Sequence, residues 1–195
     1  MTRKYVELGN MVEETMHNAI GFKYRNTPVT VVTLASLGEF VVESVSYGPL
    51  EQGREFDIPR WVAEVLVAQD KVRFKHAGVD LPDLQKALWR ETGDSVLQEL
   101  PADFLLAARR RIASLARENL QAPNDVRLAT QTKMERLLRD LIANRLLKLM
   151  KIALREERLE ETKKKMAEEE RWLVERLVNL LRNWQKDVLE SGTYD

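Results

Sequence analysis

The spacing of apolar residues changes once along this chain of 195 residues, near residue 80, and that change constrains the fold more than any other feature. Before it, apolar and β-branched residues come in short runs and alternations, which are typical of strands. After it, they recur every three or four residues, which is typical of helices. We therefore predict an α+β protein, mainly α, with a small β-rich domain over residues 1–76 and an α-helical bundle domain over residues 77–195.

The β-rich domain is predicted to hold four strands and one short helix. Two apolar runs, residues 29–34 and 40–45, flank a Ser-Leu-Gly turn, so we expect them to pair with each other as a hairpin. Residues 55–58 alternate between charged and apolar side chains, as a half-buried strand requires. A helix is expected to begin at Pro59, because the first helical turn tolerates a missing backbone N–H. A last strand over residues 72–75 closes the domain.

The helical domain is marked by residues that begin helices. Asp80 can cap the first helix, Pro101 can open the second, and Asn124 can cap the third. Between residues 134 and 152 the third helix is apolar over more than one face, so it must be covered on several sides. The charged run 155–171 has no apolar stripe, and we interpret it as a solvated helical extension or a connector.

The last helix, residues 166–190, carries two tryptophans that are candidates for protein contacts. Trp172 and Trp184 lie on adjacent faces, at about 100° per residue. Either one packs in the core and the other on a neighbouring chain, or both pack in the core. Aromatic anchors dominate the energetics of protein interfaces. The candidate subunit-interface residues come from the third and last helices: Leu137, Leu141, Trp172, Leu177 and Trp184.

The composition excludes several kinds of chemistry. The chain has no cysteine, which excludes disulfides, thiolate zinc sites and cysteine nucleophiles and favours an intracellular location. It has no apolar run of 18 residues and no signal segment, so we expect a cytoplasmic protein that does not enter a membrane. No nucleotide-binding glycine loop is present, and the two histidines, His17 and His76, belong to no metal-binding pattern. We predict a protein that is not an enzyme, with no catalytic, cofactor-binding or metal-binding residues.

The charge balance argues against strong DNA binding. Lys+Arg and Asp+Glu number 31 each, so no long-range field attracts the chain to nucleic acid. Two basic triplets, residues 109–111 and 163–165, could neutralise phosphates, but acids or apolar stripe residues surround both. A nucleic-acid-binding module is therefore the alternative function, and we expect weak or no autonomous DNA binding.

A segment of the β-rich domain carries the resemblance to a known family. Residues 48–74 contain Gly48-Pro49 at a turn and an apolar-Pro-x-Trp-apolar-Ala helix start that includes Pro59 and Trp61. This segment resembles the small β-domain of GINS subunits, and the order of β-domain before helical domain is similar to the archaeal subunit related to the second and third eukaryotic Psf proteins. Pro59 is expected to fix the start of the helix, and Trp61 to plug the small core.

The resemblance implies a non-catalytic structural subunit of a DNA replication complex. It implies a heterotetramer with two copies of this subunit and two of a second GINS subunit of opposite domain order, packed through the helical domains. The expected further partners are the MCM helicase, a RecJ-family protein, and primase or polymerase, at the replication fork on the nucleoid.

Overall fold

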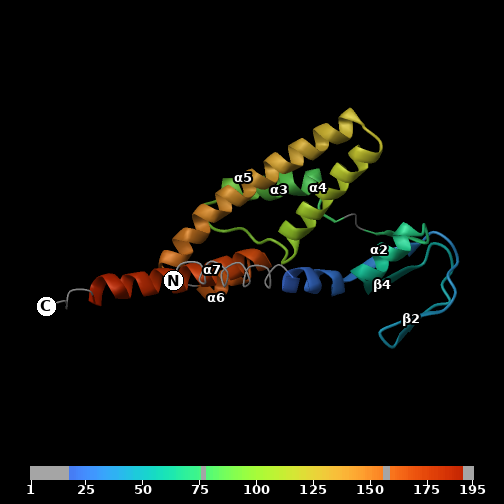
Figure 1. Ribbon diagram of the computed structural model, residues 1–195, viewed down its shortest axis with the longest axis horizontal. Helices are drawn as coiled ribbons and strands as arrows, with labels where there is room; N and C mark the ends of the chain where they lie inside the picture. The colour runs from blue at the N-terminus through green and yellow to red at the C-terminus, as the bar shows by residue number, and fades with distance from the viewer. Residues whose placement is uncertain (1–17, 76–77, 156–158, 191–195) are drawn as a thin grey trace, which may run out of the picture. The chain divides into compact units, whose positions relative to one another are not determined.

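The computed structural model describes residues 18–75, 78–155 and 159–190, and the chain divides into two compact units, Met1–Ala77 and Gly78–Asp195 (Figure 1). Strands occur in the first unit and long helices in the second, so the predicted fold class, α+β and mainly α, is confirmed. Both histidines, His17 and His76, lie outside the described residues.

The first unit is built on a three-stranded antiparallel sheet in the order β4-β1-β5. Its elements are β1 (Pro28–Thr33), β2 (Phe40–Val42), β3 (Val45–Tyr47), β4 (Glu55–Pro59), α2 (Arg60–Ala68) and β5 (Val72–Phe74). One face of the sheet packs against α2, and the buried core comprises Val31, Ile58, Val62, Ala63 and Val72. The alternation that predicted a half-buried strand is confirmed in β4, where Ile58 is buried and Asp57 is exposed.

The predicted pairing of the first two apolar runs is wrong. β1 pairs with β4 and β5, whereas β2 pairs with β3 across the tight turn at Glu43 and Ser44. Both turn residues have positive φ, which non-glycine residues rarely adopt, and Glu-Ser is not the Asn-Gly pair that usually marks such a turn. Phe40 stacks on Tyr47 at 5.4 Å between ring centroids, and both contact Phe56 of the sheet.

The role predicted for Trp61 is also wrong. Trp61 is 38% exposed, because the residues of α2 that are buried against the sheet are the next two, Val62 and Ala63. Pro59 is the last residue of β4 and immediately precedes α2, close to its predicted place. Gly48 has φ +96, and a Cβ there would lie 2.8 Å from the Gly38 carbonyl oxygen, so this turn requires glycine.

The second unit is a helical bundle around one long helix. Its elements are α3 (Leu81–Gly93), α4 (Phe104–Gln121), α5 (Asp125–Arg155), α6 (Leu159–Lys163) and α7 (Glu168–Glu190). α5 contacts α3, α4 and α7, which explains why its apolar residues cover a wide arc (Figure 1). Asp80 and Asp83 form a capping box at the start of α3. The Asn124 side chain accepts a hydrogen bond from the Arg127 N–H at 3.0 Å, so both predicted caps are confirmed.

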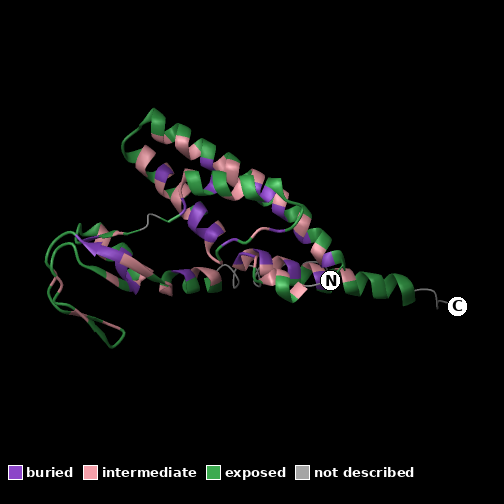
Figure 2. Ribbon diagram, turned by 180° about the vertical axis from the view of Figure 1, so that it is seen from behind, coloured by how far each residue is buried: buried purple, intermediate pink, exposed green. Residues whose placement is uncertain are grey.

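The sequence predicts a solvated extension or a connector over the charged run 155–171, but part of this run is buried. Met166 and Ala167 have no exposed surface, and Met166 joins a core cluster with Leu97, Leu149 and Val174. Figure 2 shows buried residues along the parts of α5 and α7 that face each other, and exposed residues over the last turns of α7. The short connection between α6 and α7 is therefore part of the bundle core.

Candidate functional site

An exposed apolar surface on α5 and α7 is the strongest candidate site. In the C-terminal half of α5 the exposed large apolar side chains are Ile142, Leu146, Leu147, Met150 and Leu154. At about 100° per residue these positions fall within an arc of roughly 140°. The buried residues of the same helix, including Leu141 and Leu149, occupy the adjoining arc, which meets the exposed arc near Ile142. α5 is thus apolar on two faces, and this chain covers only one of them.

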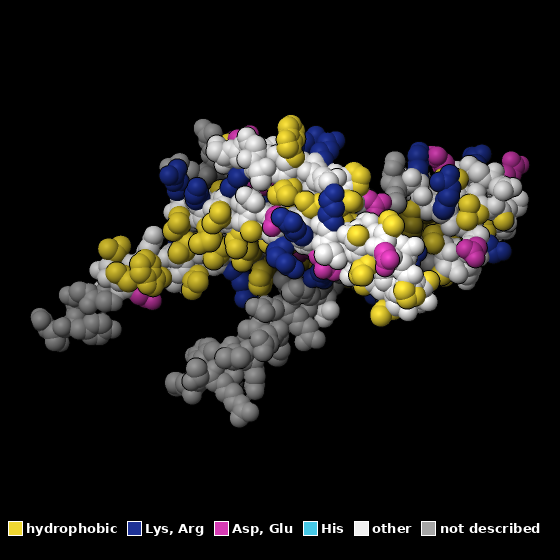
Figure 3. Space-filling model, turned by 90° about the horizontal axis from the view of Figure 1, so that it is seen from above, with side chains coloured by type: hydrophobic (Ala, Val, Ile, Leu, Met, Phe, Trp, Pro, Cys, Tyr) yellow, Lys and Arg dark blue, Asp and Glu magenta, His cyan; other side chains and the backbone are white. Residues whose placement is uncertain are grey.

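The apolar stripe of α7 is longer than the part of the bundle on which it packs. Val174 and Val178 are buried against α5, but the stripe continues through Leu180, Trp184 and Val188, all more than half exposed. In Figure 1 the C-terminal half of α7 extends past the end of α5. Figure 3 shows apolar side chains gathered over this end of the helical unit. An amphipathic helix with an uncovered stripe requires a partner surface.

The five predicted interface residues divide between core and surface. Leu141 has no exposed surface, so its prediction as an interface residue is wrong and it packs within this chain. Leu137, Trp172 and Leu177 are partly buried, and Trp172 also receives the Arg176 guanidinium 4.5 Å from its ring centroid. Trp184 is 61% exposed and lies in the uncovered stripe.

A buried ionic network that the sequence analysis missed holds the helices behind this surface together. Arg145 on α5 is fully buried and donates five hydrogen bonds. Two go to Glu170 of α7 at 2.6 and 2.8 Å, and one goes to Glu91 of α3 at 2.6 Å. The other two go to the carbonyl oxygens of Gln98 and Lys165. Every guanidinium N–H therefore has an acceptor.

The charges in this network balance. Lys148 lies 2.6 Å from the second carboxylate oxygen of Glu91, so two cations face two carboxylates. Burial alone would lower the pKa of Arg145, but the hydrogen bonds and negative charge of Glu170 and Glu91 raise it. A signal for the network was present in the sequence, because Arg145 lies four residues from both Leu141 and Leu149 on the core-facing stripe.

The basic triplets are partly neutralised within the chain. Arg111 donates to Asp80 at 2.8 Å and lies 3.6 Å from Glu118. Lys163 contacts Glu160 and Glu175, whose hydrogen bonds raise the pKa of the lysine. Neither triplet forms a free basic stripe of the kind that tracks a phosphate backbone.

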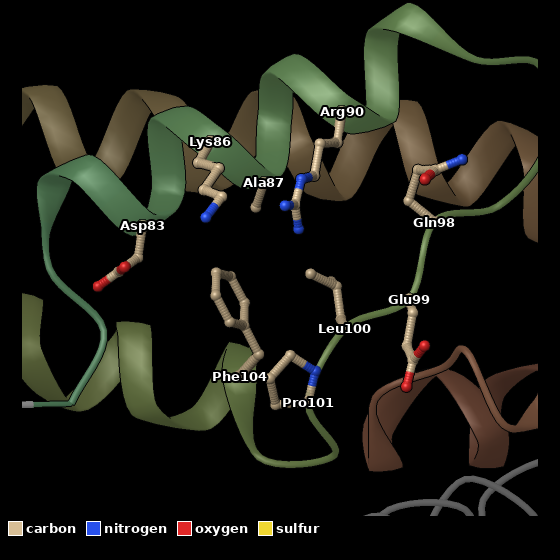
Figure 4. A pocket seen from close by; sticks show the side chains of 9 residues that line it. All are labelled: Asp83, Lys86, Ala87, Arg90, Gln98, Glu99, Leu100, Pro101 and Phe104. Atoms are coloured by element: carbon tan, nitrogen blue, oxygen red, sulfur yellow. The ribbon is translucent and has the colours of Figure 1, made fainter.

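A small concavity lies between α3 and the start of α4, with a volume of about 200 Å³ (Figure 4). The Lys86 and Arg90 side chains point into it above Phe104 and Leu100, whereas the Glu99 carboxylate points away. The volume is below the roughly 300–1,000 Å³ typical of small-molecule sites. Across residues 18–75, 78–155 and 159–190, no group of three or more metal-ligating side chains could hold an ion.

The described residues define an α-helical bundle protein with an uncovered apolar surface, the class of protein that acts by assembling with other chains. Its family follows from a comparison with family models, because residues 79–189 match Sld5, the GINS complex protein helical bundle domain. The match covers more than half of the chain, which therefore belongs to this family and is a subunit of the GINS DNA replication complex, as the resemblance of the β-rich domain predicted.

GINS proteins are non-catalytic structural components, so the expectation that the chain is not an enzyme agrees with its family. None of the curated proteins matches this chain. No helix within the described part of the chain is long and apolar enough to cross a membrane.

Proposed function

We propose that this chain is the GINS subunit whose β-domain precedes the helical domain, of the archaeal type related to the second and third Psf proteins. It assembles with a GINS subunit of opposite domain order, two copies of each, through the α5 and α7 surface. In the assembled state it links the MCM helicase to a RecJ-family protein and to primase or polymerase. The order of the two units along the chain supports the subunit type.

The uncovered stripe on α7 is the observation that carries this proposal. Trp184 and its stripe neighbours are apolar at helical spacing yet have no surface to pack on within the described residues. Burial of one large apolar side chain stabilises by about 1.5–3 kcal/mol, so a few such residues can hold a permanent complex. The ion-paired basic residues and the balanced charge disfavour DNA binding as the primary role.

The test is the solution mass of the chain alone and after coexpression with the second GINS subunit from the same genome, by light scattering after size exclusion. We expect a stable particle containing two copies of each chain. The variant Trp184→Asp should fail to form it while retaining its helical circular dichroism. Trp89→Asp is the matched control, because Trp89 is also exposed but lies on α3, away from the stripe.

A wild-type chain that stays monomeric beside the second subunit would contradict the assembly proposal. Equal loss of the complex in both tryptophan variants would contradict the assignment of the interface to α7. The links to helicase and other factors are tested separately, by capture of purified MCM on the assembled complex and on the chain alone.

A further inference from the structure

A groove between α4, α5 and α7 adjoins the exposed apolar surface. Its volume is about 240 Å³, and its walls are mainly leucine and isoleucine side chains. Ile142 and Leu146 belong both to the groove and to the exposed arc of α5. The groove therefore opens onto the surface that we assign to subunit assembly, and a helix docked there would cover both.

One polar atom in this apolar setting has no partner. The Oε2 atom of Glu169 is buried and accepts no hydrogen bond among the described residues. Its neighbours in sequence are satisfied, since Glu168 contacts Arg171 and Glu170 binds Arg145. An unsatisfied buried acceptor is uncommon because it has lost its water without a replacement.

The surroundings of Glu169 do not compensate for this loss. Burial raises the pKa of Glu169, and the charges of Glu170 and Glu168 add to this. A hydrogen bond from the backbone of Glu169 and the charge of Arg109 lower the pKa, but the net shift is upward. Arg109 also lines the groove, yet no ion pair joins it to Glu169. The glutamate thus weakens the isolated chain, and a role outside the isolated chain explains why it occupies this position.

We propose that the groove receives a helix of the partner GINS subunit that places an apolar side chain among the leucines and a lysine or arginine against Glu169 Oε2. This inference rests on the proposed function and adds the partner's chemistry. Glu169 is then a specificity-determining residue, because a partner without the basic group would leave the carboxylate buried and unpaired. A small-molecule ligand fits less well, since the groove is smaller than about 300 Å³.

The experiment compares Glu169→Leu with wild type in two measurements. The melting temperature of the isolated chain should stay equal or rise, because the unpaired carboxylate is gone. The dissociation constant of the complex with the second GINS subunit, measured by titration calorimetry, should increase at least about tenfold, because the partner's basic group loses its acceptor. Glu161→Leu is the control, with the same charge change at an exposed position on α6.

Two further results make the outcome decisive. Glu169→Gln retains the shape and one acceptor oxygen, so it should weaken assembly less than the leucine variant even if the latter folds poorly. A zero-length carbodiimide cross-link in the wild-type complex should join Glu169 to a lysine of the second subunit where the partner residue is lysine.

Wild-type affinity in both variants would overturn the inference while the proposed function stands. A cross-link to a second copy of this chain would also overturn it, and absence of any wild-type complex overturns both proposals.

Discussion

Replacement of Arg145 by methionine tests the buried network directly. The substitution removes all five hydrogen-bond donors and leaves the Glu170 carboxylate, 7% exposed, without its cation. Glu91 keeps Lys148, so the larger loss falls on Glu170. Removal of one partner of a buried ion pair typically costs about 3–5 kcal/mol. We expect the free energy of unfolding of the helical unit to fall by about this amount.

The assay is urea unfolding of the full chain followed by circular dichroism at the helical band, which reports mainly the second unit. The double variant Arg145→Met/Glu170→Met should be more stable than Arg145→Met by about 2 kcal/mol, because an apolar pair replaces a broken ionic one. Arg139→Met is the control, since Arg139 is exposed on the same helix and its loss should change stability by less than about 0.5 kcal/mol.

Two results would refute this reasoning. If Arg145→Met unfolds within about 1 kcal/mol of wild type, water must reach the site and the pair is not a buried one. If the double variant is no more stable than the single variant, the loss comes from packing of the arginine stem and not from an unpaired carboxylate.

Three further predictions concern local features. Asp80→Ala should destabilise the helical unit by about 1 kcal/mol in thermal melts, because it removes a helix cap and the ion pair with Arg111. Gly48→Ala should destabilise the β-rich unit by about 1–3 kcal/mol, seen as faster proteolysis, whereas Gly38→Ala should not, because a Cβ at Gly38 meets open space. Since the folded pKa of Glu169 is raised, the isolated chain loses stability as the pH rises above the ordinary glutamate range. Glu169→Gln should therefore be more stable than wild type at pH 7 in urea titrations, and this advantage should vanish at acid pH where the carboxyl group is neutral in both states.

The features that could be predicted from sequence are those determined within a few residues. The caps at Asp80 and Asn124 bond to backbone groups three residues away, so their chemistry is visible in a short window. The change of apolar period near residue 80 is equally local, because it shows in the spacing of neighbouring apolar residues. The Glu43-Ser44 turn was missed because neither residue usually adopts the positive φ that the turn requires.

The ionic network could not be located because its members are far apart in the chain. Glu91 lies 54 residues before Arg145, and Glu170 lies 25 residues after it. Sequence alone shows one charged residue on an apolar stripe in each helix, with nothing to pair them. Arg145 interrupts the core face of α5, and Glu170 precedes Val174 and Val178 on α7. These positions predict that both charged side chains are buried, but they do not identify the partner of either one.

The division of apolar surface between core and exterior links the fold to the family. α5 uses one face to bind α3, α4 and α7, and its other face adds no stability to the isolated chain. The first half of the α7 stripe likewise packs in the bundle. The second half packs on no other described residues. A chain that buried these residues in its own core would be more stable alone. Their exposed position therefore favours a protein whose folded state is completed by other subunits. Its measured stability should then depend on the concentration of its partner, because a subunit that binds only the folded state stabilises it by mass action.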